Sequence, residues 1–487
     1  MKISSKVNAA LALLSAVVTL ALAGCAHPTN PSAGAPALRA PWQAGMAEID
    51  ITPPVGFRMA GYFDERFSTG VHDPLKAKAM VLQQGGRQIA LVFCDLIGLS
   101  LDISRPARER ASGLTGIPVT NIIIAATHSH TGPLFDDVRG DYFHKEAIKK
   151  YGKDTHEVID LPEFLRDRLV KVIVAAKANL RPSELEAGIA TQKGISFNRR
   201  YLMKDGTLRT NPGLRNPKVM GPAGPIDPDV GILLVKHIGQ PEPVGGLTVF
   251  AMHADTTSGT LFSADYPYGL QQTLRETFGG NYISAFAAGT SGNINHVDTS
   301  KPPGTRVNGA DIAFQLGTTL GKTVLADVPD LTRIDHPELG SRSETLMLPL
   351  QKVTPRDIAE AQVVLPRMAD PHVDFFEKVR ATTVLDLAHR PKIYPMEVQV
   401  FRLDKETAIV CLPAEIFVEF GLAIKAASPF KRTMVIEISN DRPSYVPTLK
   451  AFPQGGYEVM NSRVAPGGGE KMTEAAIKML NELNRAP

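Results

Sequence analysis

The sequence has few cysteines, almost no net charge and, after residue 25, no apolar run long enough to span a bilayer. The missing apolar runs exclude a transmembrane helix from the body of the chain. The 53 basic and 50 acidic residues nearly cancel, and no basic stripe interleaved with aromatic residues occurs, so we expect no nucleic-acid partner. No repeat of the length found in solenoids or propellers is visible, which argues against those architectures.

Cysteine occurs at positions 25, 94 and 411. Cys94 and Cys411 each lie in an apolar run, and we therefore expect buried thiols. A single disulfide between them stays open as an alternative, because the N-terminus indicates export to an oxidising compartment.

The first 24 residues have the pattern of a secretory signal peptide, with Lys2 and Lys6 ahead of an apolar segment at residues 7–22. Leu-Ala-Gly-Cys at 22–25 resembles a bacterial lipobox, in which the cysteine is lipidated and becomes the mature N-terminus. An ordinary cleavage site nearby is the alternative. We expect an exported protein, anchored through lipidated Cys25 to the membrane of the cell envelope, in the periplasm or outer membrane. Residues 25–45, rich in Pro, Ala, Gly and Ser, predict a flexible tether before one domain at 46–487.

Apolar strands and amphipathic helices alternate through this domain and predict an α/β fold, a mixed β-sheet core flanked by helices. A short edge strand is expected after Ala47, and residues 183–230 are expected to be rich in loops. Residues 335–395 are consistent with either a separate small domain or an insertion. Strands are expected at 89–94, 122–126, 230–236, 247–252, 282–288, 397–403, 407–411 and 434–438, and helices at 105–114, 165–176, 312–324 and 472–483.

The strand at 122–126, Ile-Ile-Ile-Ala-Ala, is followed directly by His128 and His130. Because side chains alternate across a strand, residues two apart point the same way, and both imidazoles can face one site. Such a pair can hold a metal ion, although two histidines with ordinary structural roles fit the same spacing.

Other predicted strands also end in polar residues, and in α/β sheets ligands bind outside the carboxyl ends of the strands. Together these ends offer two histidines, a glutamate and a tyrosine, a donor set that suits zinc with one position open for water or substrate. Each residue also has an ordinary interpretation: a strand-end histidine, a carboxylate in the first turn of a helix, a half-buried aromatic. The polar residues at these strand ends are Asp95, His128, His130, His253, Asn293, Asn295, Glu415 and Tyr445.

The order of short motifs resembles the catalytic domain of neutral/alkaline non-lysosomal ceramidases over about residues 47–470. These motifs are Asp-Ile-Thr-Pro, Met-Ala-Gly-Tyr, Ala-Thr-His-Ser-His-Thr-Gly-Pro, Asn-Arg-Arg, Ile-Asp-Pro, Gly-Asn-Ile-Asn, Pro-Ala-Glu and two tyrosines twelve residues apart. The resemblance implies a hydrolase of an amide (N-acyl) bond that acts on a lipid-like or small-molecule substrate. It also implies one Zn²⁺ ion held by His128, His253, Glu415 and Tyr445, with His130, Arg199 and Tyr457 lining the reaction centre.

Two departures from that family stand out. The family's active-site serine falls on Asn295, and a carboxamide cannot replace that nucleophile, which puts ceramide itself in question as the substrate. We also expect no counterpart of the immunoglobulin-like domain that follows in ceramidases.

Without the serine, the expected chemistry is attack by a zinc-activated water on the carbonyl. Arg199 and Tyr457 would stabilise the oxyanion, His130 would carry the proton to the leaving group, and Asn295 would donate its amide to the substrate. Hydrolysis of an ester, lactone or other small polar substrate is the alternative at the same site. A non-catalytic, ligand-binding surface lipoprotein is the alternative of another class.

Overall fold

The computed structural model describes residues 41–135 and 137–486. The predicted signal peptide, Cys25 and most of the predicted tether lie outside these residues. The predicted tether, residues 25–45, extends too far, because strand β1 begins at Trp42 and runs to Asp50. β1 is also not an edge strand, since it pairs with β3 on one side and β6 on the other.

The first of two main sheets is mixed and has the order β14-β12-β11-β6-β1-β3-β4-β5, with β16 paired to β6. Pairs β4–β5 and β12–β14 are parallel, and the remaining pairs are antiparallel. Its strands besides β1 are β3 (Lys76–Gln84), β4 (Arg87–Cys94), β5 (Ile122–Ala126), β6 (Arg181–Thr191), β11 (Asp229–His237), β12 (Gly245–Phe250), β14 (Ile283–Ala288) and β16 (Thr332–Arg333).

The second sheet has the order β17-β18-β19-β21 and packs face to face against the first. Phe93 and Leu233 of the first sheet share one buried cluster with Phe401, Ile409 and Ile436 of the second. Apolar side chains on both inner faces therefore close the space between the sheets. The second sheet consists of β17 (Gly340–Pro349), β18 (Ile393–Arg402), β19 (Thr407–Cys411) and β21 (Arg432–Ile436).

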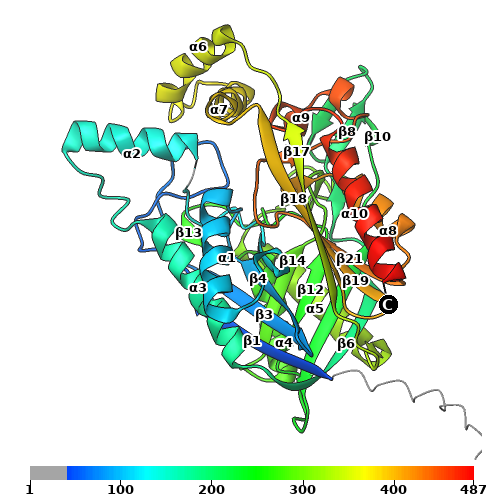
Figure 1. The fold of residues 1–487 in the computed structure, drawn as a ribbon. Helices are drawn as coiled ribbons and strands as arrows, with labels where there is room; N and C mark the ends of the chain where they lie inside the picture. Colours follow the sequence, from blue (N-terminus) through cyan, green and yellow to red (C-terminus); the bar gives the residue numbers. More distant parts are fainter. Residues whose placement is uncertain (1–40, 136, 487) are drawn as a thin grey trace, which may run out of the picture. The chain divides into compact units, whose positions relative to one another are not determined.

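Helices cover both outer faces of the sheet pair (Figure 1). On the first sheet lie α1 (Leu101–Thr115), α3 (Leu161–Ala178), α4 (Tyr266–Phe278) and α5 (Ala310–Asp327). On the second lie α8 (Val418–Ala427) and α10 (Gly468–Arg485). The predicted class, a mixed sheet core flanked by helices, is confirmed, and the layers run helix, sheet, sheet, helix.

The region 335–395 supplies the edge strand β17 and then a helix pair, α6 (Pro355–Val364) and α7 (Phe375–His389). These helices share a small core of their own that includes Val364 and Leu385. Outside the main layers lie α2 (Val138–Tyr151), α9 (Tyr457–Met460) and the short strands β2 (Gly70–Val71), β7 (Phe197–Asn198), β8 (Arg200–Met203), β9 (Leu208–Thr210), β10 (Val219–Pro222), β13 (Leu261–Phe262), β15 (Ile294–Asn295), β20 (Glu415–Ile416) and β22 (Tyr445–Val446).

Strand ends of both sheets meet at one seam. Ala125 at the end of β5 bridges Ser439 after β21, the Glu437 amide donates to the Ala288 carbonyl at 2.9 Å, and Ile438 donates to Ala414 at 3.0 Å. Loops distant in sequence are thereby held side by side, and the site forms here.

Cys94 and Cys411 are buried and free, so no disulfide joins them. In the described ranges, no helix combines the length and apolarity needed to cross a bilayer.

Candidate metal centre

His128 owes its direction to its own backbone. The strand β5 stops at Ala126, and His128 adopts the left-handed conformation with φ 69°. Alternation along a strand therefore does not explain how His128 and His130 come together, although their Nε2 atoms lie 3.2 Å apart. Left-handed backbone is costly for a residue with a side chain, and it is concentrated at functional sites.

Three imidazoles are oriented in the same way by backbone carbonyls. Nδ1 of His128 donates to Ile97 O at 2.7 Å, Nδ1 of His130 to Gly61 O at 3.0 Å, and Nδ1 of His253 to Ser291 O at 2.9 Å. A carbonyl only accepts, so in the neutral rings each proton is on Nδ1 and each Nε2 carries a lone pair. This arrangement is typical of histidines that bind a metal through Nε2.

The three Nε2 lone pairs converge. Nε2 of His128 lies 3.2 Å from Nε2 of His130, and the three residues can offer ligand atoms within 4.8 Å of one another. Two unprotonated nitrogens at this distance cannot hydrogen-bond to each other. A positive charge beside them would relieve this repulsion.

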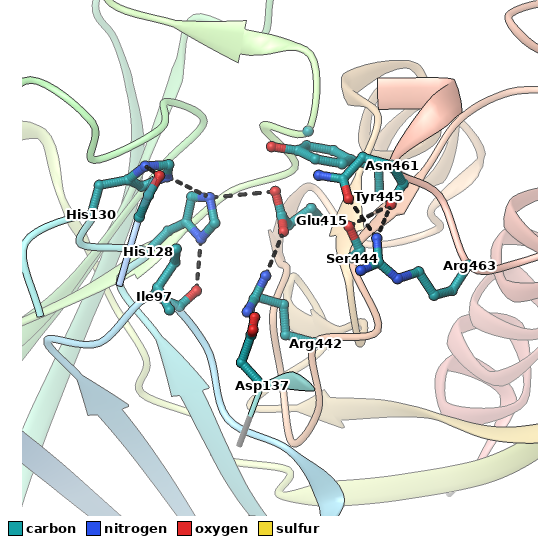
Figure 2. Close-up of polar contacts among 12 residues, drawn as sticks. Ile97, His128, His130, Asp137, Glu415, Arg442, Ser444, Tyr445, Asn461 and Arg463 are labelled. Carbon is teal, nitrogen blue, oxygen red and sulfur yellow. Dashed lines mark hydrogen bonds and ion pairs between the residues drawn. The ribbon is translucent and has the colours of Figure 1, made fainter. Parts of the chain in front are cut away.

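Glu415 and Tyr445 complete the cluster from the short strands β20 and β22. They are register partners in the parallel pair β20–β22. The buried Oε2 of Glu415 has no hydrogen bond and lies 3.4 Å from Nε2 of His128 and 3.7 Å from Nε2 of His253. The Tyr445 hydroxyl lies 3.4 Å from Nε2 of His253. Figure 2 shows Glu415 facing His128. An orphaned carboxylate oxygen beside these donors fits a bound cation.

Burial and neighbouring charges keep most of these groups in the form that binds metal. Burial, with Arg199 and His128, lowers the pKa of His253 to about 4. Burial and His128 also lower the pKa of His130. Burial alone would raise the pKa of Glu415, but His128 and His253 hold it well below its usual value. Neutral imidazoles and an ionised carboxylate are the ligand forms. Burial and Glu415 raise the pKa of Tyr445, so the phenol stays protonated without a cation.

Arg199 and Tyr457 lie against the same cluster. The Arg199 guanidinium is 5.4 Å from the Tyr445 ring centroid and 5.8 Å from that of Tyr457. Its Nε donates to Glu458 at 2.9 Å and its Nη2 to Gly292 O at 2.8 Å. Burial opposes its charge, yet Tyr445 and Glu458 raise its pKa overall. Tyr457 lines the cavity above the cluster. The structure thus brings both residues to the predicted centre.

Asn295 has a different environment. Its Nδ2 donates to Oδ1 of Asn211 at 3.1 Å, and its Oδ1 accepts from the Val297 amide at 3.1 Å. It is buried and not in the cavity wall. His253 is also outside the wall, but its Nε2 faces Glu415 and Tyr445. The predicted donation from Asn295 to a substrate therefore has no support in these contacts.

A cavity of about 100 Å³ opens beside His128, His130, Glu415 and Tyr445. Most of its charged wall consists of residues that were not predicted from the sequence. Among the charged residues of the wall, Arg442 could most easily have been found from the sequence, because it lies three residues before the predicted ligand Tyr445. The others come from loops and helices with no distinguishing pattern. The missed charged residues are Asp137, Arg139, Asp386, Arg390, Arg442 and Arg463.

A family model described as neutral/alkaline non-lysosomal ceramidase, N-terminal, matches residues 42–293, more than half of the chain. The neutral ceramidase of Pseudomonas aeruginosa is 27% identical over 278 residues, which are 54% of this chain and 38% of that protein. The match thus spans well under two thirds of the relative's length.

Two solved structures share the fold. A crystal structure of neutral ceramidase from Pseudomonas aeruginosa superposes with a TM-score of 0.66 at 19% identity, over 92% of this chain and 75% of that one. A ceramidase complexed with C2 gives a TM-score of 0.66 at 19% identity, over 91% and 75%. Glu415, Tyr445 and Tyr457 lie beyond the residues that the family model matches.

Proposed function

This chain belongs to the neutral/alkaline non-lysosomal ceramidase family, and from that premise we propose that it is a zinc-dependent hydrolase of an amide (N-acyl) bond. The observation that carries the proposal is that Nε2 of His128 and Nε2 of His253 both face the orphaned carboxylate oxygen of Glu415. We assign His128, His253, Glu415 and Tyr445 as the ligands of one zinc ion.

When bound, zinc supplies Lewis acidity and makes water acidic enough to lose a proton near neutral pH. The protein's own groups divide the remaining work. His130 is neutral and faces the cluster, so it accepts a proton at Nε2 and passes it to the leaving amine. The Tyr457 hydroxyl and the Arg199 charge stabilise negative charge on the substrate oxygen. None of these roles needs a serine at position 295.

An uncharged ester or lactone would be attacked by the same groups, and a protein that only binds its ligand would show no turnover. The test uses the protein loaded with one equivalent of zinc and a panel of N-acyl amides, esters and lactones. Release of amine from amides, lost when zinc is removed and recovered when it is restored, is the expected result. Hydrolysis of esters alone, or no turnover by the zinc-loaded protein, would contradict the proposal.

We further propose that the protein is exported and lipid-anchored through Cys25, on the strength of the N-terminal sequence. Labelling of cells with a radioactive fatty acid, with Cys25→Ala as the control, tests this separately. Label retained by the variant would contradict it.

A further inference from the structure

The cavity wall carries more positive than negative charge among the described residues. Four arginines face three carboxylates, and a divalent cation would add to the excess. The arginines are Arg139, Arg390, Arg442 and Arg463, and the carboxylates are Asp137, Asp386 and Glu415. A cavity of this kind attracts an anion.

Three of these arginines pair with Asp137 or Asp386. Asp137 binds Arg139 with both oxygens, Oδ1 to Nε at 2.8 Å and Oδ2 to Nη2 at 2.9 Å. Asp386 accepts from Nε of Arg390 at 2.9 Å and from Nε of Arg463 at 2.8 Å. These pairs are built into the wall and hold it in shape.

Arg442 is different. Its Nη1 donates to Oε1 of Glu415 at 3.2 Å, and its Nε and Nη2 have no hydrogen bond to any other side chain or carbonyl in the described part of the chain. The side chain is 27% exposed. Figure 2 shows its guanidinium beside Glu415 and near Asp137.

The Arg442 side chain is also held in position. A Cβ at Gly98 would stand 2.3 Å from both Cδ and Nε of Arg442, so only glycine at 98 leaves room for it. The neighbouring Ile97 carbonyl orients His128. One loop after β4 therefore places both a candidate zinc ligand and the free edge of Arg442.

We propose that Arg442 binds a carboxylate on the substrate, which makes N-acyl amino acids the preferred substrate class. This inference rests on the proposed amide hydrolysis. A guanidinium edge presents two parallel N–H groups that match the two oxygens of a carboxylate. Since Arg442 touches Glu415, the carboxylate lies next to the scissile amide, as it does in an N-acyl α-amino acid. The uncharged hydroxyls of a ceramide offer no such partner.

The test compares two probes with the same acyl chain and amide, N-hexanoylglycine and N-hexanoylethanolamine. We expect kcat/KM of the zinc-loaded protein to favour the glycine conjugate by roughly 10-fold or more. Arg442→Gln should bring that ratio close to one. Gly98→Ala keeps the charge of Arg442 but displaces its side chain, so it should lower the ratio of the two kcat/KM values as well. Arg356→Gln, a change at an arginine 87% exposed on α6, should leave the ratio as it is.

The ratio separates the two proposals. Cleavage of both probes with equal kcat/KM would overturn the role of Arg442 and leave amide hydrolysis standing. Cleavage of neither probe would count against amide hydrolysis, and calorimetry would then decide the role of Arg442. The role of Arg442 would be overturned if the Arg442→Gln variant bound N-hexanoylglycine as tightly as wild type does, with zinc content and melting temperature at the wild-type level.

Discussion

Nε2 of His128 lies 3.2 Å from Nε2 of His130, and the backbone carbonyls of Ile97 and Gly61 accept from Nδ1 of the two rings, which in the neutral rings leaves a lone pair on each Nε2. Glu415 adds a buried carboxylate oxygen with no hydrogen bond. Such a cluster is costly when nothing positive lies within it, because acceptors repel one another in a medium of low dielectric. A bound cation would therefore stabilise the folded protein.

The first prediction follows from this cost. Removal of metal by a chelator should lower the free energy of unfolding, and zinc at about 100 times its Kd should restore about 2.7 kcal/mol. Thermal melts of the chelated and zinc-loaded protein measure the difference. Identical melting temperatures over a zinc titration would contradict a site that is specific to the folded state.

A second prediction concerns the individual ligands. His253→Ala and Glu415→Gln should each lower bound zinc from one ion per chain to near zero and abolish turnover, since each removes a donor from the cluster. His144→Ala is the matched control, because His144 lies with Asp154 and Glu157 in another group of three residues able to hold an ion. Elemental analysis of the purified proteins gives the stoichiometry. Zinc lost from His144→Ala and kept by His253→Ala would move the site to that other group.

The third prediction concerns Glu437, which was missed in the sequence. Its Oε1 accepts from the Ser291 hydroxyl and its Oε2 from the Ile416 amide, each at 2.6 Å. Ser291 orients His253 and Ile416 adjoins Glu415, so this one carboxyl joins two ligand-bearing loops. Burial and Glu415 raise the pKa of Glu437 well above its usual value, which favours the neutral acid.

Glu437→Gln should therefore change the unfolding free energy by less than about 1 kcal/mol, because a neutral amide keeps the shape and the acceptor. Glu437→Leu should cost about 2–4 kcal/mol by leaving two buried donors unpaired, and should weaken zinc binding by roughly 10- to 100-fold. Urea titration and zinc titration measure these effects. A larger loss of stability in the glutamine variant than in the leucine variant would mean that the carboxyl is ionised.

Long periodic elements could be predicted from the sequence, and tertiary contacts could not. Leu165, Leu169, Val172 and Ala176 repeat with the helical period and do form the buried side of α3. The strand β6 was missed because Arg181–Thr191 contains an early proline and several charges. The strand forms despite these charges because the backbones of β1 and β11 pair with it on both sides.

The candidate site shows the same division. The strand-end donors were predicted because polar residues after buried strands are visible in one sequence. The left-handed backbone of His128, the contact of Arg442 with Glu415 and the pairing of Asn295 with Asn211 depend on segments that meet only in the fold. No local pattern encodes them.

The fourth prediction uses His296, next to Asn295. Its Nδ1 lies 3.0 Å from Oδ1 of Asp255 and its Nε2 lies 2.9 Å from Oδ1 of Asn308, so both ring nitrogens face acceptors. Burial would lower the pKa of His296, but Asp255 outweighs it and raises the pKa to about 8. Asp255 is in turn held ionised, since His296 lowers its pKa against the effect of burial.

A pKa raised by folding stabilises the protein fully below the value in the unfolded chain, about 6.5, and this contribution is lost as the pH rises through about 8. The rise in the pKa of His296 from about 6.5 to about 8 corresponds to about 2 kcal/mol of folding free energy. The unfolding free energy of wild type minus that of His296→Gln should therefore shrink by about this amount between about pH 6 and pH 9. Urea titrations at the two pH values, repeated with Asp255→Asn as the background, measure it. A free-energy difference that stays constant with pH would show that His296 is neutral. A difference that shrinks equally in the Asp255→Asn background would show that Asp255 is not the group that raises the pKa of His296.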